Sequence, residues 1–592
     1  MPGVSAPVRY AGTSMWSFLR HALLPNPNPI GFGPADGLEL ALAALLLFTA
    51  LAWRPCLAPR LGALAKRTGL AMLLLAALPV ALRLLLLGRH PVPMPDVYDE
   101  FSHLLVADTL RHFRLANPPH ALPQFFETFF TFQRPSYSSI YSAGQGLVLA
   151  LGWNLFGLPW AGVLMATAAY CALCYWMLRA WVSPGWALAG GALAVMEFGP
   201  LCQWTNGYWG GSAGAAAGCL VFGALPRLRE RPRVRYGVLL GFGLALHLLI
   251  RQFESLFLFL AVALYFLPEI RKVGQAVSPA NRELRRCLAA IALALTPAIL
   301  LTVLQSHAVT GSWTTLPEIL SQYQYGVPAG LTFQAAPVPH NTLTPQQEAE
   351  YRSQIAFHQG PETLATYLQR LEYRVRFYRF FFLPPLYIAA LAFCARLSEY
   401  RYAWVALTLA LFALGTNFFP AFQSHYLAGV ACLFVLVSVA GLETLGRLTV
   451  REQKVGFEAA GLLFLLCCGQ FLFWYGMHLA DDSEVSQNAR LYETWDGLNH
   501  RNPARRIQVA RELAAIPGKL LVFVRYGPHH VFQDEWVYNA ADIDGARVVW
   551  ARDLGTDENR KLLVYYPGRT PLLLDPDDRP QRLGAYEPDH RP

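Results

Sequence analysis

Charged side chains are scarce in this sequence. Only 15% of its 592 residues are Asp, Glu, Lys or Arg, whereas 54% are hydrophobic and the mean hydropathy is +0.30. Soluble proteins carry about 25% charged residues. The shortage of charge therefore excludes an ordinary soluble protein and indicates an integral membrane protein.

The hydrophobic residues gather in runs that are long enough to cross a membrane, which takes roughly 20 apolar residues. Short loops with clustered Arg and Lys separate some of these runs, and the positive-inside rule places such loops in the cytoplasm. The sequence then predicts about twelve transmembrane helices, with both termini and the first large loop outside. The predicted spans are residues 37–54, 69–88, 160–181, 184–203, 207–226, 237–250, 253–268, 288–307, 380–395, 403–419, 426–445 and 455–475.

The net charge of +9 does not indicate a nucleic-acid partner. The basic residues concentrate in the predicted inner loops, so the charge reflects topology. We therefore predict membrane lipids, and no nucleic acid, among the partners. The clusters are Arg54, Arg60, Lys66 and Arg67; Arg227, Arg229, Arg231, Arg233 and Arg235; Arg271, Lys272, Arg282, Arg285 and Arg286; and Arg447, Arg451 and Lys454.

Cysteine is absent from the large regions predicted to lie outside, so the sequence predicts no disulfide framework there. Cys171 and Cys174 have the C-x-x-C spacing of a zinc ligand pair, but they lie in an apolar run without further Cys or His partners. We interpret them as packing residues. The ten cysteines are Cys56, Cys171, Cys174, Cys202, Cys219, Cys287, Cys394, Cys432, Cys467 and Cys468.

The predicted fold is mainly α: a polytopic membrane helix bundle over residues 1–478 and a small soluble α/β domain over residues 479–592. The bundle carries two large outer loops, residues 89–158 and 308–379. We expect the tail to fold outside the cytoplasm as a three-stranded parallel α/β unit, because a helical pattern and short β-rich runs alternate in it. Its role is either to help bind the acceptor of a reaction or to act as a stabilising cap. These segments are residues 501–515, 519–525, 546–551 and 571–574.

The stretch MPDVYDEFSHLLVADTLRH, residues 94–112, concentrates charge in the first outer loop. Its apolar spacing predicts a short helix along the membrane surface, with Asp99 just ahead of it. Asp99 then either caps this helix or acts with Glu100 as a catalytic carboxylate, since partial desolvation near lipid raises carboxylate basicity. The ionisable residues of the stretch are Asp96, Asp99, Glu100, His103, Asp108 and His112.

Two motifs in the outer regions are specific enough to suggest a family. The first is Tyr98-Asp99-Glu100-Phe101-Ser102-His103-Leu104-Leu105, followed by Ala107-Asp108-Thr109 and by Arg114-Leu115-Ala116-Asn117-Pro118. The second is Asn206-Gly207-Tyr208-Trp209-Gly210-Gly211, between two predicted spans. Together they resemble a bacterial branch of the GT-C superfamily of integral-membrane glycosyltransferases, similar to the protein-mannosyltransferase and aminoarabinose-transferase type. The resemblance covers roughly residues 69–475.

The resemblance implies a GT-C-like bundle in the bacterial inner membrane, with the active site facing the extracytoplasmic side. The implied activity moves a sugar from a polyprenyl-phosphate donor to a lipid, glycan or protein acceptor, with inversion. Asp99 would be the general base, and Glu100 would orient the acceptor or a metal. Because the leaving group is a lipid phosphate, a cation or a divalent metal ion is needed to stabilise it.

The same resemblance implies a set of substrate-binding residues. Arg251 and Glu254 stand in a turn similar to the R-P-x-E of the branch, and His425 with Tyr426 resembles its H-Y pair. From the residues alone, a local Arg251–Glu254 ion pair and a capping His425 stay open as alternatives, as does an ordinary lipid headgroup contact for Arg379. The implied residues are Arg251, Glu254, His425, Tyr426, Tyr137, Tyr141, Asn206, Tyr208, Trp209 and Arg379.

The sequence departs from the branch at two positions. Ile140 stands where a Lys is expected to touch the donor phosphate, and Gln252 replaces the Pro of R-P-x-E. The loop around Asn206 offers no second carboxylate, which argues against a two-carboxylate metal site. Two other classes therefore stay open: a transporter or flippase of a lipid-linked precursor, and a diverged GT-C-like protein without transferase activity.

Overall fold

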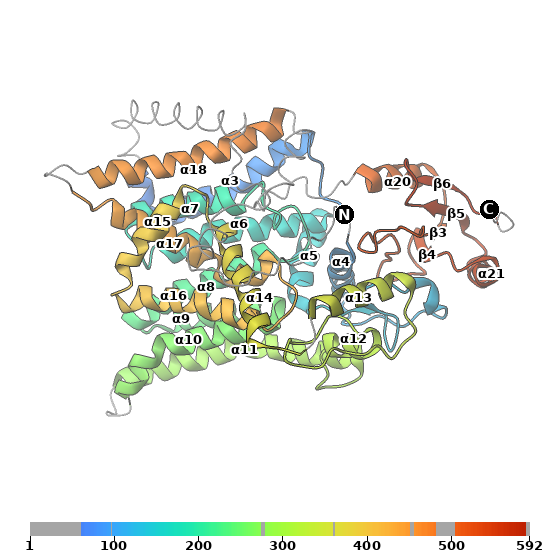
Figure 1. Cartoon of the computed structure of the whole chain (residues 1–592), viewed down its shortest axis with the longest axis horizontal. Helices are drawn as coiled ribbons and strands as arrows, with labels where there is room; N and C mark the ends of the chain where they lie inside the picture. Colours follow the sequence, from blue (N-terminus) through green and yellow to red (C-terminus); the bar gives the residue numbers. More distant parts are fainter. Residues whose placement is uncertain are drawn as a thin grey trace.

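A computed structural model of the chain describes residues 61–95, 97–273, 279–358, 361–449, 455–480 and 504–587. The predicted span at residues 37–54 lies outside the described residues. A large helical part fills one end of the molecule, the tail forms the other end, and α4 lies between them (Figure 1).

The membrane part and its loops are helical. The elements before the second outer loop are α3 (Thr68–Leu85), η1 (Leu86–Gly88), α4 (Tyr98–Arg111), η2 (Pro123–Phe126), β1 (Thr131–Phe132), β2 (Ser138–Ser139), α5 (Ala143–Phe156), α6 (Pro159–Leu178), α7 (Pro184–Phe198), α8 (Gly211–Glu230), α9 (Val234–Ile250), α10 (Gln252–Val273) and α11 (Pro279–Thr310). Those that follow are α12 (Pro317–Tyr325), α13 (Pro345–His358), α14 (Leu364–Phe377), η3 (Tyr378–Phe381), α15 (Leu386–Phe393), η4 (Cys394–Arg396), α16 (Tyr400–Thr416), η5 (Ser424–Val430), α17 (Ala431–Leu445) and α18 (Val455–Ala480).

Several helices of the described part are long and apolar enough to cross a membrane. A bent pair that meets at 115°, Leu364–Phe381 and Leu386–Arg396, would add one more. The mainly helical membrane class is therefore confirmed, whereas the count of twelve crossings is matched only in part. The five long helices are Thr68–Gly88, Pro159–Leu178, Arg282–Thr310, Ser424–Leu445 and Val455–Ala480; Val234–Ile250 and Gln252–Leu267 are apolar but shorter.

Proline and glycine account for the predicted spans that the structure interrupts. The span expected at residues 380–395 breaks at Pro384 and Pro385, which carry no backbone N–H for a helical hydrogen bond. The span expected at residues 184–203 ends with α7, and an irregular loop, residues 199–210, leads into α8. This loop carries most of the second motif.

The helices α8 and α17 form the centre of the bundle. Of the apolar window in Ser424–Leu445, 94% is buried. A Cβ added to Gly218 of α8 would lie 1.9 Å from the carbonyl oxygen of Gly429 in η5. Only glycine permits this approach, which brings η5 and its neighbours against α8.

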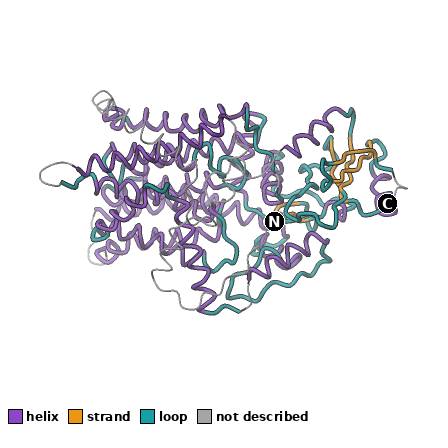
Figure 2. The backbone as a smooth tube through the Cα atoms, turned by 45° about the horizontal axis from the view of Figure 1, so that its top comes forward, coloured by secondary structure: helices purple, strands orange, loops and turns teal. Residues whose placement is uncertain are grey.

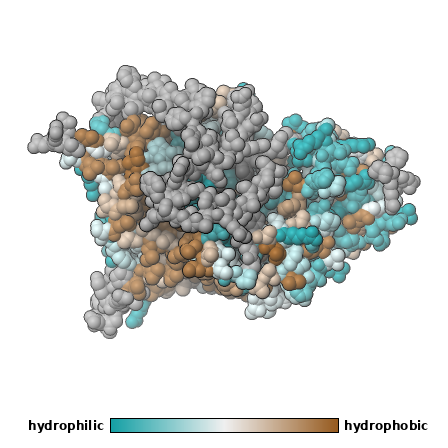
Figure 3. All heavy atoms as spheres, viewed as in Figure 1, coloured by the Kyte–Doolittle hydropathy of each residue, from teal (hydrophilic) through white to brown (hydrophobic). Residues whose placement is uncertain are grey.

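The tail contains α20 (Ala504–Ala515), β3 (Leu520–Val524), β4 (Val548–Arg552), α21 (Thr556–Tyr565), β5 (Thr570–Asp575) and β6 (Arg582–Ala585). The strand order is β4-β3-β5-β6, with the first three parallel and β6 antiparallel to β5. The predicted three-stranded parallel unit is confirmed and gains one edge strand. The strands gather at one end of the molecule (Figure 2), and the tail surface is more hydrophilic than the helical part (Figure 3).

Candidate active site

The acidic motif begins α4. Val97 has an extended backbone (φ −104°, ψ 154°) and is the N-cap, so Tyr98 is the first helical residue and Asp99 and Glu100 lie in the first turn. The interpretation of Asp99 as the N-cap is therefore wrong. Two carboxylates in the first turn remain favourable, because the helix dipole is positive at this end.

Side chains of α4 point toward different partners. Asp99 and His103 are four residues apart and share one face of the helix. Phe101 and Leu105 line a pocket shared with the tail. Asp99 is half-buried, whereas 7% of the His103 surface is exposed. The helix therefore lies between the tail and the residues around Asp99.

Glu100 connects the two sequence motifs. Its side chain is buried, and Oε1 accepts a hydrogen bond from the backbone N–H of Tyr208 at 3.2 Å. A Cβ added to Gly207 would lie 3.2 Å from the same oxygen, so glycine lets the loop approach the carboxylate. We interpret Glu100 as a residue that holds α4 against this loop. Its role toward an acceptor or a metal stays a prediction.

The second motif is held by hydrogen bonds to the protein. Oδ1 of Asn206 accepts a bond from Nε of Arg83 at 2.7 Å, and its Nδ2 donates to two carbonyls of its own loop at 2.9 Å. The Tyr208 hydroxyl donates to the carbonyl of Pro93 at 2.8 Å. These contacts give Asn206 and Tyr208 a positioning role in the loop that presents Trp209.

Asp99 and Tyr141 are joined directly. The Tyr141 hydroxyl donates to Oδ1 of Asp99, and the Tyr141 ring stacks on His103 with centroids 4.1 Å apart and planes 20° apart. Burial, with the Asp99 charge second, raises the pKa of Tyr141 well above its usual value, so the hydroxyl stays a donor. Burial, with the Arg251 charge second, lowers the pKa of His103 to about 3, so its ring is neutral.

Arg251 occupies the break between α9 and α10. Its guanidinium carbon lies 4.7 Å from the centroid of the Tyr426 ring. The charges of Glu254, Asp99 and Arg374 also act on Tyr426. Charges from α4, the α9–α10 break, α10 and α14 thus act on one tyrosine of η5, and the guanidinium of Arg251 faces its ring.

A hydrogen-bond chain fixes the turn at Arg251. Nδ1 of His247 lies 2.7 Å from Oγ of Ser255, and this hydroxyl donates to the Arg251 carbonyl at 2.6 Å. The Arg251 N–H donates to the His247 carbonyl at 2.7 Å. The last turn of α9 is thereby tied to the first turn of α10, with Arg251 between them.

An aromatic row continues from Tyr426. The ring centroid of buried His425 lies 5.0 Å from Tyr426 and 5.1 Å from Trp209. The Trp204 indole donates to Oγ of Ser424 at 3.1 Å, which ties the second motif to η5. The structure therefore brings Trp209, His425 and Tyr426 together.

Arg374, a basic residue of α14 that precedes Arg379 in the sequence, reaches the site. Its side chain is buried, its guanidinium carbon lies 4.2 Å from the Phe422 ring centroid, and Nη2 donates to the Phe419 carbonyl at 2.6 Å. The charge of Arg379 acts on Tyr387 instead. A contact of Arg379 with the donor phosphate stays a prediction.

Two residues of the first outer loop have partners other than Asp99. The Tyr137 hydroxyl donates to the carbonyl of Asn539 in the tail at 3.0 Å. Ile140 is buried in an apolar cluster with Phe130 and Val309. Ile140 therefore packs inside the loop, where a lysine in the same direction would have no access to a phosphate.

Glu318, in the first turn of α12, also belongs to the site, although no sequence motif predicted it. Its side chain is exposed at the surface of the described residues, yet the surrounding protein atoms, with the Glu254 charge second, raise its pKa to about 7. Arg251 acts in the opposite direction. Glu318 therefore lies near the pair of Arg251 and Glu254.

The donor set around Asp99 does not fit a two-carboxylate metal site. Among the described residues, no group of three His, Cys, Asp or Glu side chains comes together in a metal-binding arrangement. Glu100, the neighbouring carboxylate, is bound to the backbone of Tyr208. The guanidinium groups of Arg251 and Arg374 supply positive charge near Tyr426.

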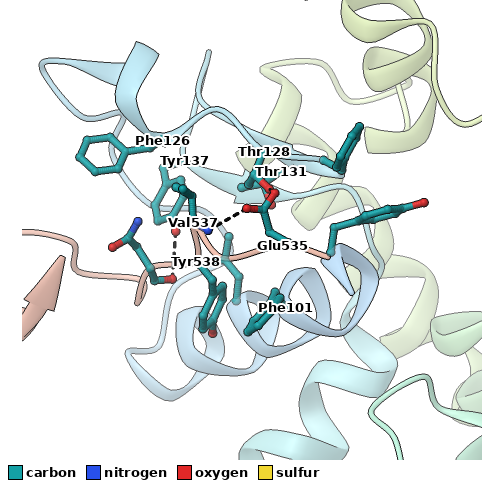
Figure 4. A pocket seen from close by; sticks show the side chains of 12 residues that line it. Phe101, Phe126, Thr128, Thr131, Tyr137, Glu535, Val537 and Tyr538 are labelled. Carbon is teal, nitrogen blue, oxygen red and sulfur yellow. Dashed lines mark hydrogen bonds between the residues drawn. The ribbon is translucent and has the colours of Figure 1, made fainter. Parts of the chain in front are cut away.

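The pocket on the other side of α4 belongs to the contact with the tail (Figure 4). Glu535 is buried at its edge, and its carboxylate accepts bonds from the Thr128 hydroxyl, from the Tyr526 hydroxyl at 2.7 Å and from the Val537 N–H at 2.7 Å. The carboxylate of Glu535 is thus hydrogen-bonded within the protein. The lining residues are Tyr98, Phe101, Leu105, Phe126, Thr128, Phe129, Thr131, Tyr137, Glu535, Val537, Tyr538 and Asn539.

Further contacts fasten the tail to the back of α4. The Phe101 ring centroid lies 4.6 Å from that of Tyr538 and 4.7 Å from the guanidinium carbon of Arg506. Oδ2 of Asp108 accepts a hydrogen bond from the Ala541 N–H at 2.7 Å. The tail is therefore packed on the helix that carries Asp99.

No family model matches the sequence, and no curated protein matches it. Several solved structures resemble the fold. ArnT from Cupriavidus metallidurans in the apo state is 10% identical, with 86% of this chain and 93% of that chain covered and a TM-score of 0.48. The same protein bound to undecaprenyl phosphate is 10% identical, with coverages of 84% and 92% and a TM-score of 0.46.

An archaeal oligosaccharyltransferase, AglB from Archaeoglobus fulgidus with an inhibitory peptide and a dolichol-phosphate, is 14% identical. The match covers 86% of this chain and 69% of that chain, with a TM-score of 0.36. These proteins are GT-C glycosyltransferases. Because the TM-scores are all below 0.5, the functional proposal depends on the geometry of the site.

Proposed function

We propose that this protein is an integral-membrane glycosyltransferase of the GT-C type. It transfers a sugar from a polyprenyl-phosphate donor to a hydroxyl of a lipid, glycan or protein acceptor on the outer face of the bacterial inner membrane. The observation that carries the proposal is that Arg251 lies over the ring of Tyr426 and Arg374 over the neighbouring ring of Phe422, while the charge of the tyrosine-bound carboxylate, Asp99, also acts on Tyr426.

The reaction needs a base and a stabilised leaving group. Asp99 takes the proton of the acceptor hydroxyl. At the same time, the oxygen of that hydroxyl forms a bond to the anomeric carbon of the sugar. The bond from that carbon to the lipid phosphate breaks with inversion, and the electron pair leaves with the phosphate. Arg251 and Arg374 supply positive potential where this negative charge develops.

The remaining site residues hold and shape the substrates. Trp209, His425 and Tyr426 offer a row of ring faces next to the cations, which suits the apolar faces of a sugar or an isoprenoid. Glu254 lies near Tyr426 and Arg251. A divalent metal ion stays a prediction of the resemblance, and no step above depends on it.

The transporter alternative receives less support. A transporter is expected to place its ionisable site residues and broken helices at the bilayer midplane. Asp99, His103 and Glu318 instead belong to the two outer loops. The two departures from the branch do not remove a residue of the proposed site. Ile140 packs in an apolar cluster, and Gln252 starts α10 directly after Arg251.

The tail acts, in this proposal, as a cap on the helix that carries the base. Its contacts with Phe101 and Asp108 reach the side of α4 away from Asp99. A direct contribution of the tail to acceptor binding remains a prediction from the sequence.

The test is to incubate the purified protein in lipid nanodiscs with undecaprenyl-phosphate-linked sugars and with lipid, glycan and peptide acceptors. Release of undecaprenyl phosphate, followed by mass spectrometry, reports transfer. We expect at least one donor and acceptor pair to release it at a rate that depends on Asp99. Binding of undecaprenyl phosphate without release from any donor, in the wild-type protein, would favour the transporter or the inactive alternative.

A further inference from the structure

The ring of Tyr141 must be held in one orientation if its hydroxyl is to stay on Asp99. The backbone of Tyr141 is anchored, because its N–H donates to Oγ of Ser139 at 2.9 Å and its carbonyl accepts from Nε2 of Gln305 at 2.9 Å. These anchors fix the position of the chain. They leave the side-chain torsions of Tyr141 free to choose among rotamers.

His103 restricts those torsions. Its ring lies flat against the Tyr141 ring at 4.1 Å, and the Phe130 ring meets Tyr141 edge-on at 5.9 Å with planes 81° apart. His103 and Asp99 are separated by one helical turn on the same face of α4. The helix thus offers a flat surface to the Tyr141 ring and a carboxylate to its hydroxyl.

A hydrogen bond at Nδ1 does not explain the histidine at position 103. Its Nδ1 is buried and has no hydrogen-bond partner among the described residues. Burial and the nearby Arg251 keep the ring uncharged. The property that the site uses is therefore the flat, neutral face of the ring.

We propose that His103 is a positioning residue, which acts through Tyr141 to keep the tyrosine hydroxyl bound to Oδ1 of Asp99. The inference rests on the proposed role of Asp99 as the base. A hydrogen bond to the ionised carboxylate favours that form and lowers the pKa of Asp99. The groups near Asp99 include Tyr141 before α5 and Tyr426 in η5, and the charges of Arg251, Glu254 and Arg374 also act on Tyr426.

Infrared titration of the full-length protein in nanodiscs measures this property without turnover. The protonated carboxyl band that disappears in Asp99→Asn identifies Asp99. We expect Tyr141→Phe, which removes the hydroxyl, and His103→Leu, which fills the space without a flat ring, to raise the pKa of Asp99 by about one unit. His103→Phe keeps a flat neutral ring and should retain the wild-type value.

The proposal is overturned if folded His103→Leu keeps the wild-type pKa of Asp99, or if His103→Phe shifts it as far as His103→Leu does. His103→Met provides the same comparison if the leucine variant yields too little folded protein. The outcome is separate from that of the proposed function. A shifted pKa together with no sugar transfer from any donor would count against the glycosyltransferase and leave the positioning role in place.

Discussion

The hydroxyl of Tyr141 and Oδ1 of Asp99 are hydrogen-bonded across 42 residues of sequence. The bond joins the first turn of α4 to the segment that enters α5, and it fixes the direction of the carboxylate. The charges of Asp99 and Arg251 both act on Tyr426. The bond between Tyr141 and Asp99 therefore lies next to the proposed phosphate site.

Arg251 should determine the affinity for the donor lipid. Hydrogen bonds to charged groups contribute about 1.5–3 kcal/mol, so Arg251→Ala should weaken undecaprenyl phosphate binding by roughly 10-fold to 100-fold. Arg251→Lys keeps the charge but loses the planar group over Tyr426. Its affinity for undecaprenyl phosphate should lie between those of the wild type and Arg251→Ala. Arg233→Ala, an exposed basic position of the predicted inner side, is the matched control. Unchanged binding in Arg251→Ala would remove this residue from the phosphate site.

Glu318 should make stability depend on pH. Its pKa rises from the ordinary 4.5 to about 7 in the folded protein. Between these values the unfolded chain loses the proton that the folded chain keeps, so the contribution of Glu318 to stability falls as pH rises. Glu318→Gln cannot ionise, and its Tm relative to wild type should increase from pH 4.5 to pH 8.

The matched control for Glu318 is Glu512→Gln, at an exposed position of α20. Its Tm difference from wild type should stay nearly flat over the same range. A flat or falling difference for Glu318→Gln would show that the carboxyl is solvated like a surface group.

Tyr538 tests the role of the tail. Its ring packs on Phe101, the residue two positions after Asp99, so Tyr538→Ala should loosen α4 and lower kcat by roughly 10-fold while the acceptor KM stays unchanged. Val564→Ala, at a side chain that is 73% exposed on α21, should leave both constants unchanged. A raised acceptor KM with normal kcat would instead support direct acceptor binding by the tail.

Much of the fold could be predicted because its signals are local. Apolar runs predicted most of the helices, and β-rich runs between helical segments predicted the parallel strands β3, β4 and β5. The strand β6 escaped prediction because Arg582–Ala585 has no alternating pattern, and pairing with β5 defines it. The start of α4 was misplaced because Val97, which has no capping side chain, precedes it.

The site could be predicted only where a motif marks it. Asp99, Arg251 and Tyr426 lie in such motifs, and Tyr141 directly follows Ile140, one of the two positions that depart from the branch. Glu318 reaches the site through the tertiary packing of α12, which no local pattern encodes, whereas Arg374 stands in the same basic run of sequence as Arg379. Ile140 was interpreted as a missing phosphate ligand, but its environment is apolar.

The predicted topology has its own test. Single cysteines at Arg114 in the first outer loop and at Lys519 in the tail should react with a membrane-impermeant maleimide in intact cells, whereas a cysteine at Arg233 should react only after permeabilisation. All three positions are exposed. Ser138, in contrast, is buried and would label poorly in either compartment. Labelling of Arg114 from the cytoplasmic side alone would contradict the outward-facing site.

The most direct test of the central claim is the rate of sugar transfer by Asp99→Asn. The substitution keeps the volume and an oxygen that can accept the Tyr141 hydrogen bond, and Asp99 is not the N-cap, so the variant should fold with a Tm close to wild type. If Asp99 is the general base, the turnover measured by release of undecaprenyl phosphate should fall by about 10²-fold to 10⁴-fold. Transfer at nearly the wild-type rate by the folded variant would contradict the account.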